Sequence, residues 1–392
     1  MLLFLITSNN YQQESMMNKI RSLVALSTIG CIGIFPLISH AAEIYNQNGN
    51  RVYLDGSFKV RHYFSQDKYI AGDQSKVKFT LRGETKINDL MIGYARWEYN
   101  VKLNQPESAG STKNTTRIGY AGVGFGQYGS FDYGRNYGIL NDINGWTGAP
   151  IPVFGGVSYD GVDNFMTYRT NNVATYRNRN IFNLVDGLDF GLQVQGKNDG
   201  WNDPENQTGP LSSNPRGVAH QNGNGVGTSL VYRFENGLSI GGAYANSART
   251  LEQRQDDLGK RADGWNVGAR YDNHNVYLAA IYGEVKNMHY IGKQDGFAPK
   301  ARGYELLAQY QFDCGLKPSL AYLNGTAKDL KGNAGSNQTY VKFIDLATTY
   351  SFNKNLALIF EYKINLLDDN TFTRNNGIST DDVFVTMLNY KF

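Results

Sequence analysis

The chain has 392 residues, a formal net charge of +3 and a polar mean hydropathy of −0.45. Tyrosine (27), phenylalanine (20) and glycine (44) are frequent, and proline (9) is scarce. Outside the N-terminal region no run of eighteen or more apolar residues occurs, which excludes a bundle of membrane-spanning helices. The composition favours short alternating strands joined by turns, in a membrane barrel or in a secreted all-β protein.

The N-terminus has the features of a secretory signal. A basic start precedes the apolar residues 23–38, and Ser39-His40-Ala41 places small residues at the two positions that signal peptidase reads. We therefore expect a signal peptide over residues 17–41 and a mature chain that begins at Ala42. Residues 1–16 precede a better start codon and are expected to be a spurious N-terminal extension.

The two cysteines cannot form a disulfide in the mature chain, because Cys31 lies in the expected signal and leaves Cys314 alone. No thiolate metal site can be built, and we expect no cofactor. An exported chain of this size without disulfides suits a large barrel that a closed ladder of hydrogen bonds stabilises.

From residue 42 onward, segments of about ten residues alternate apolar and polar side chains, as membrane strands do. Short and long connections alternate in the second half, which predicts short periplasmic turns and long outer loops. The short connections are Asn88-Asp89, Glu235-Asn236-Gly237, Asp272-Asn273-His274, Asp313-Cys314-Gly315 and Asn353-Lys354-Asn355. The long connections span residues 196–225, 249–261, 287–301, 327–338 and 367–380.

The first three strands each have one apolar and one charged face. In the first strand Val52, Phe58 and Val60 alternate with polar neighbours, and a period of two puts the two sets on opposite sides. A Lys or Arg that faces lipid at the midplane costs about 2–4 kcal/mol, so the charged face is expected to line a lumen. The bases of this inner face are Lys59, Arg61, Lys76, Lys78, Arg82 and Arg96.

The chain ends on an amphipathic strand whose last residue is aromatic. Phe384, Leu388, Tyr390 and Phe392 share one face of it. Outward aromatic side chains of this kind predict a place in the girdle at the membrane interface.

Several short segments occur together in one order along the mature chain. They are Ala42-Glu43-Ile44-Tyr45-Asn46, Gly83-Glu84-Thr85, Trp97-Glu98-Tyr99-Asn100, Gly129-Ser130-Phe131-Asp132-Tyr133-Gly134-Arg135-Asn136-Tyr137-Gly138, Ala174-Thr175-Tyr176-Arg177-Asn178, Leu184-Val185-Asp186-Gly187-Leu188, Gln309-Tyr310-Gln311-Phe312-Asp313 and the terminal Phe392. On these segments the chain resembles the trimeric general porins of enterobacteria along nearly its whole length.

The resemblance implies an all-β fold, a sixteen-stranded antiparallel transmembrane β-barrel whose third extracellular loop folds into the lumen. That loop is expected at about residues 138–172. Its own sequence suits an ordered path, because Pro150, Pro152 and Gly155 restrict it and aromatic side chains such as Phe154 can pack on the wall.

The resemblance also implies partners and a place in the cell. It implies a homotrimer in the outer membrane of a Gram-negative bacterium, in contact with membrane lipid and lipopolysaccharide. We expect a latch to the neighbouring subunit in residues 104–113, around Glu107. The implied function is a water-filled channel for passive diffusion of small hydrophilic solutes and ions.

In this family a cluster of bases on the barrel wall faces acids on the inner loop. Carried over by position, the bases here are Lys78, Arg117 and Arg169. Lys78 stands where the family usually has Arg, and the usual Lys of the first strand becomes Ser57. Further inward bases nearby are Lys59, Arg61, Arg82 and Arg96.

The usual acids of the inner loop are absent. The family pattern is Pro-Glu-Phe-Gly-Gly-Asp, whereas this chain reads Pro152-Val153-Phe154-Gly155-Gly156-Val157, so both carboxylates become Val. Asp160 and Asp163 remain nearby, but the resemblance does not place them at the narrow point.

Charge at a narrow point decides which ions enter a pore, and a low-dielectric wall focuses the field of that charge. The loss of two acids opposite a basic cluster therefore predicts an anion-preferring or weakly selective pore. The alternative is that other loop acids, Asp142, Asp160 or Asp163, restore the balance.

Two rival functions would use the same barrel. A structural or adhesive barrel with a plugged lumen needs a charge-neutralised interior, whereas the many inward bases favour water. An enzyme is disfavoured because no Gly-x-Ser-x-Gly pattern, His-x-x-x-His pair or phosphate loop occurs. The sequence has no cluster of basic and aromatic residues of the kind that binds nucleic acid, so no nucleic-acid partner is expected.

Overall fold

The computed structural model describes residues 42–110, 113–156, 158–200, 216–331 and 335–392. The expected N-terminal extension, the expected signal peptide and Val157 lie outside the described residues, as does much of the long connection 196–225. No helix of the described part is long and apolar enough to cross a membrane.

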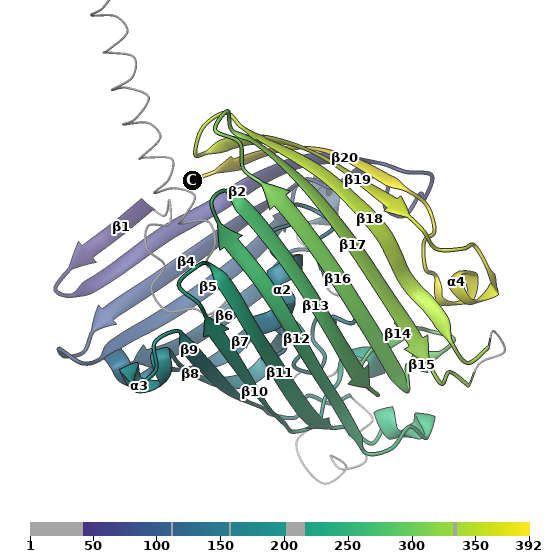
Figure 1. The fold of residues 1–392 in the computed structure, drawn as a ribbon, viewed down its shortest axis with the longest axis horizontal. Helices are drawn as coiled ribbons and strands as arrows, with labels where there is room; N and C mark the ends of the chain where they lie inside the picture. Colours follow the sequence, from purple (N-terminus) through teal and green to yellow (C-terminus); the bar gives the residue numbers. More distant parts are fainter. Residues whose placement is uncertain (1–41, 111–112, 157, 201–215, 332–334) are drawn as a thin grey trace, which may run out of the picture.

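Sixteen long antiparallel strands form one closed sheet, which confirms the expected barrel (Figure 1). Each strand pairs with the next along the chain, and the last pairs with the first. The strands are β2 (Asn50–Phe64), β4 (Lys76–Lys86), β5 (Ile92–Lys102), β6 (Thr115–Gly124), β7 (Ser130–Tyr137), β8 (Arg169–Asn178), β9 (Leu188–Gln195), β10 (Gly225–Arg233), β11 (Leu238–Ala248), β12 (Arg261–Asn273), β13 (Val276–Lys286), β16 (Lys300–Tyr310), β17 (Leu316–Lys328), β18 (Gln338–Ser351), β19 (Leu356–Asn365) and β20 (Val383–Lys391).

The two ends of the described chain close the barrel together. Strand β1 (Ala42–Gln47) pairs with the first part of β2, and β20 pairs with the second part. At the junction Gly56 and Phe392 exchange two backbone hydrogen bonds of 3.0 and 3.2 Å. The ring of Phe392 lies over Gly56 beside Phe58, where a Cβ at Gly56 would come within 2.6 Å of it. The terminal aromatic therefore covers the seam of the barrel.

The short elements lie in the connections between the long strands. They are β3 (Gly72–Asp73), η1 (Glu107–Ala109), η2 (Gly126–Tyr128), α2 (Asn141–Gly148), α3 (Asn180–Asn183), η4 (Val218–His220), η5 (Gln253–Asp256), β14 (Tyr290–Gly292), β15 (Gly296–Phe297) and α4 (Thr371–Asn376). The connections after β11, β13 and β19 are long, whereas those after β10, β12 and β18 are tight turns. The predicted alternation of short and long connections is confirmed.

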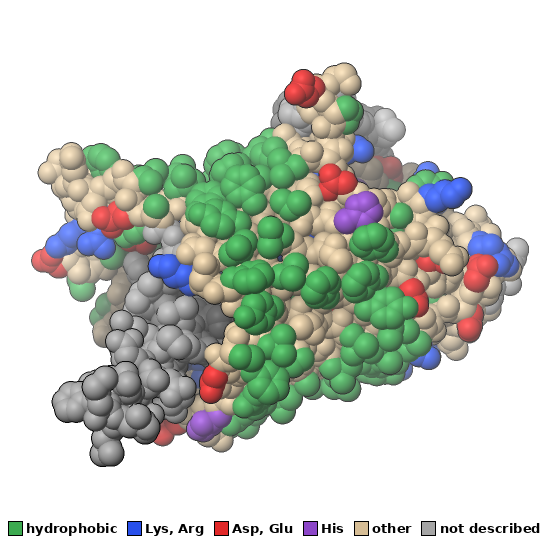
Figure 2. Space-filling model, turned by 90° about the horizontal axis from the view of Figure 1, so that it is seen from above, with side chains coloured by type: hydrophobic (Ala, Val, Ile, Leu, Met, Phe, Trp, Pro, Cys, Tyr) green, Lys and Arg blue, Asp and Glu red, His purple; other side chains and the backbone are tan. Residues whose placement is uncertain are grey.

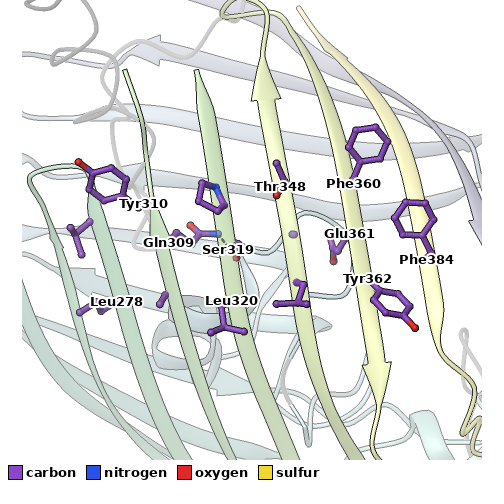
Figure 3. A pocket seen from close by; sticks show the side chains of 15 residues that line it. Leu278, Gln309, Tyr310, Ser319, Leu320, Thr348, Phe360, Glu361, Tyr362 and Phe384 are labelled. Atoms are coloured by element: carbon purple, nitrogen blue, oxygen red, sulfur yellow. Dashed lines mark hydrogen bonds between the residues drawn. The ribbon is translucent and has the colours of Figure 1, made fainter. Parts of the chain in front are cut away.

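The outer wall is apolar, as the strand alternation predicted. Large side chains such as Leu278, Tyr310, Leu320 and Phe360 are exposed on it. Figure 2 shows hydrophobic side chains gathered over the face seen from above, and Figure 3 shows a shallow groove of this wall between β13 and β20. In a membrane these side chains contact lipid, and the alternate residues point inward.

The segment between β7 and β8, residues 138–168, folds into the lumen, and we call it the inner loop. Its helix α2 contacts β11, β12, β13 and β16. Its buried apolar side chains form a core with the inner faces of these strands, as expected for the third loop. The loop is shorter than the expected 138–172, because Arg169 already begins β8.

The wall beneath the inner loop is built from small residues. Inward positions there are often Ala or Gly, among them Ala279, Ala301 and Ala321. A Cβ at Gly283 would overlap the hydroxyl of Tyr159, and a Cβ at Gly303 would overlap Ser158. The loop packs closely because these strand positions leave it space.

We expect the substitution Gly283→Val to displace the inner loop, because the new side chain would occupy the place of the Tyr159 hydroxyl. Overpacking of this kind costs about 1–3 kcal/mol. Limited chymotrypsin digestion of the folded barrel should then cut the loop at its aromatic residues. The matched control is Gly83→Val, since nothing lies within 4 Å of a Cβ there. Equal resistance of both variants would contradict the proposed packing.

Candidate functional site

Three of the predicted wall bases converge on one buried carboxylate. Glu98 on β5 is 3% exposed and lies 2.5 Å from Arg117 Nε, 3.1 Å from Arg96 Nη2 and 3.6 Å from Lys78 Nζ. The bases come from β4, β5 and β6, and strand alternation directs Lys78, Arg96 and Glu98 inward. Glu98 therefore partly neutralises the cluster and holds its side chains in fixed positions.

Backbone irregularities aim two arginines at this cluster. The ladder between β5 and β6 skips Arg117, and the ladder between β7 and β8 skips Arg135. Bulges turn a side chain out of the regular alternation. Arg135 then donates to the carbonyl oxygens of Thr116 and Arg117 and pairs with Asp163 of the inner loop.

Four other inward bases make no ion pair within 4 Å in the part of the chain that the structure describes. Arg61 donates to the Gln74 carbonyl and lies 5.1 Å over the ring of Tyr63, and Arg169 lies 4.7 Å over the ring of Tyr168. Lys59 and Lys76 are opposite each other on β2 and β4. In this part of the wall the basic groups have no described carboxylate within 4 Å. The four bases are Lys59, Arg61, Lys76 and Arg169.

Arg82 pairs with a different acid from the one that the three bases share. It is opposite Arg96 in the ladder, lies 3.3 Å from Asp55 and stacks on Tyr53. Of the bases predicted from the sequence, the structure thus brings Lys78, Arg96 and Arg117 together on one acid, and it pairs Arg82 separately.

Two wall carboxylates hold the inner loop by its backbone and side chains. Glu361 on β19 accepts from the N–H groups of Val153 (3.0 Å) and Phe154 (2.7 Å). Glu305 on β16 accepts from the Thr147 hydroxyl (2.6 Å) and the Ser158 N–H (2.9 Å). Figure 3 shows Glu361 among the outward aromatics of the neighbouring positions. The sequence analysis did not identify Glu305 or Glu361 as anchors. The only indication of them in the sequence is that each is an acid at an inward position of a strand.

The loop motif itself is apolar where the family has acids. Val153 and Phe154 pack against a wall cluster from β19 and β20, formed by Ile359, Val383, Val385 and Met387. Pro152, Gly155 and Gly156 are partly exposed. The side chain of Val153 therefore makes apolar contact with the barrel wall, where the family pattern would place a carboxylate.

The remaining loop acids have separate positions. Asp142 is buried, binds Arg177 at 2.6 and 2.8 Å and accepts from the hydroxyl of Ser229. Asp163 pairs with Arg135, which leaves Asp160 as the acid nearest the motif: a Cβ at Gly156 would lie 3.5 Å from its Oδ2. Asp142 thus attaches the inner loop to β8 and β10.

The phenol of Tyr159 is buried within the inner loop, and this burial determines its protonation state. Tyr159 is 1% exposed and donates its hydroxyl hydrogen to Asn144 Oδ1 at 2.8 Å. Burial raises the pKa of its phenol well above the ordinary value, because the charged form would lose water. Tyr159 therefore remains a neutral donor at any physiological pH.

We expect Glu361→Gln to loosen the loop tip, because an amide offers one acceptor oxygen where the carboxylate offers two. The loss of one buried acceptor costs about 1–3 kcal/mol. Hydrogen exchange at the amides of Val153 and Phe154 should accelerate about tenfold or more, since 1.4 kcal/mol is a factor of about ten. Glu284→Gln is the control, because Glu284 pairs with Arg302 on the outer face. If the exchange rates of these two amides are unchanged in Glu361→Gln, Glu361 does not anchor the loop tip.

Comparison with known proteins agrees with this architecture. The model of the Gram-negative porin family matches residues 47–392. Outer membrane protein F of Serratia marcescens is 49% identical over 369 residues, which covers 90% of this chain and 95% of that protein. Outer membrane porin N of Escherichia coli strain K12 is 45% identical over 365 residues, with 90% and 95% covered.

A solved structure, the Salmonella typhi OmpF complex with daunomycin, superposes with a TM-score of 0.80 at 38% identity, covering 90% of this chain and all of that one. The family resemblance expected from the sequence is confirmed, and the relatives are channels of the outer membrane. The chain therefore belongs to the Gram-negative porin family and is an outer-membrane porin rather than an enzyme.

Proposed function

We propose that this porin is a general diffusion channel whose constriction is anion-preferring or weakly selective. The observation that carries the proposal is the group of inward bases without an ion pair in the described part of the chain, Lys59, Arg61, Lys76 and Arg169. The loop motif carries Val153 where the family pattern has an acid, and Val153 packs on the apolar wall cluster of β19 and β20.

The sign of the field follows from simple Coulomb reasoning. Glu98 supplies one negative charge against Lys78, Arg96 and Arg117. The inner-loop acid Asp163 pairs with Arg135. The wall between β2 and β8 therefore keeps an excess of positive charge, and a low-dielectric wall focuses it on the water path.

We expect Val153→Glu to shift the selectivity toward cations. At about 8 Å in water, one unit charge changes the energy of an ion by about 0.5 kcal/mol, which is about twofold for each ion in opposite directions. The cation-to-anion permeability ratio should rise about fourfold, measured as the reversal potential in a KCl gradient across a planar bilayer. Val153→Gln is the control, because it adds the same volume without the charge.

The wild-type measurement decides the proposal itself. If the reversal potential of the wild-type porin in a KCl gradient shows that potassium permeates clearly better than chloride, the proposal is wrong. The alternative, that Asp160 supplies the negative charge that the loop motif lacks, has its own test. If Asp160 compensates for the missing loop acids, Asp160→Asn should increase anion permeability as strongly as Val153→Glu decreases it.

We further propose that the channel is a homotrimer with a latch in residues 104–113. In the described part of this segment Glu107 is exposed in η1, and the amide of Asn104 binds the carbonyl of Asp73. The mass of the unheated detergent complex should equal three chains. Glu107→Ala should lower the temperature at which the complex dissociates and leave the barrel folded. A monomeric wild-type complex would refute the trimer.

The proposed surroundings and processing have direct tests as well. The apolar outer wall supports contact with membrane lipid and lipopolysaccharide. The signal-peptide features support cleavage after Ala41. The intact mass of the chain purified from outer membranes should correspond to residues 42–392, and a larger mass would show that residues before Ala42 are retained.

A further inference from the structure

An apolar patch of the lumen wall directly adjoins the unpaired bases. In the ladder between β2 and β20, Tyr63 is opposite Val385, Arg61 is opposite Met387 and Lys59 is opposite Asn389. Val385 and Met387 point inward and are fully buried. The wall thus changes from apolar to basic within two residue steps along β2, a distance of about 7 Å.

The inner loop continues this patch into the water path. Phe154 and Val153 pack against the same wall cluster, together with Tyr63 and Ile70. The ring centres of Phe154 and Tyr63 are 5.9 Å apart, and the ring planes are inclined by 65°, in an edge-to-face contact. Both side chains remain partly exposed, and Tyr63 points inward, so their free surface faces the lumen. Part of the Tyr63 and Phe154 pair is therefore accessible to a passing solute.

Cations border the rings on both sides. Arg61 lies 5.1 Å over the ring of Tyr63, and Lys363 lies 6.0 Å from the centre of the Phe154 ring. Lys363 is opposite Asp345 in the ladder, but no ion pair within 4 Å joins them, and Lys59 and Arg61 make none in the described part of the chain either. A basic side chain therefore lies beside each of the two rings.

We propose that Tyr63 and Phe154, with Lys59 and Arg61, form a transit site for organic anions that carry an aromatic body. The anionic group contacts Lys59 and Arg61, and the aromatic body covers the accessible part of the two rings. Charge complementarity selects the anion, and removal of apolar surface from water favours an aromatic body over a small polar one. This inference rests on the proposed anion preference and names its solute class.

The test uses two permanently ionised probes, benzenesulfonate and methanesulfonate, with potassium as the common cation. Bi-ionic reversal potentials of the whole porin in planar bilayers give their permeability ratio. Tyr63→Gln and Phe154→Gln should each lower the ratio of benzenesulfonate to methanesulfonate about threefold, because polar side chains replace the apolar contact.

The control is Tyr53→Gln. Tyr53 is also an inward tyrosine of β2 with an arginine, Arg82, over its ring, but it is not part of the apolar cluster. This variant should leave the ratio unchanged. Because Tyr63 lies on strand β2, Tyr63→Gln does not alter the inner loop itself. A lower ratio in this variant therefore reports loss of the site, whereas Phe154→Gln could also act by displacing the loop.

The outcomes distinguish this inference from the proposed selectivity. A reduced ratio in Tyr63→Gln alone, or in both site variants, with an unchanged KCl reversal potential supports the site. An unchanged ratio in Tyr63→Gln, or an equal decrease in Tyr53→Gln, overturns it. A cation-selective wild type in KCl refutes the proposed selectivity separately, whatever the sulfonate ratio shows.

Discussion

The inner loop has to fit inside a closed barrel, and most of the lumen follows from this constraint. Glu305 and Glu361 accept backbone N–H groups of the loop that would otherwise be buried without a partner. Gly283 and Gly303 leave space where a Cβ would collide with the loop. Strand β16 provides both an acceptor and empty volume, because close packing tolerates neither a buried donor without a partner nor an overlap.

The loop divides the lumen into two unlike halves. It covers the small and apolar residues of β10–β17 and leaves water to the wall between β2 and β8. Several inward bases lie on that wall, and Glu98 is shared by three of them. Of the loop acids, Asp163 pairs with Arg135 and Asp142 with Arg177.

The mode of anchoring explains how such a change of charge is tolerated. Glu361 binds the backbone of Val153 and Phe154, not their side chains. The side chain at position 153 can therefore change from acid to Val without loss of the anchor, and Val gains contact with Ile359 and Met387. The anchor is thereby independent of the side chain at position 153.

The sequence by itself determined the strand faces, the pattern of connections, the terminal aromatic and the inward direction of bases such as Lys59 and Lys78. These features are local, because a period of two and a tight turn depend on neighbouring residues. Only the tertiary structure decided that Glu98 gathers three bases and that bulges aim Arg117 and Arg135. It also decided that Glu361 binds a segment about two hundred residues away. Such contacts depend on the path of the inner loop through the closed barrel, which strand periodicity does not encode.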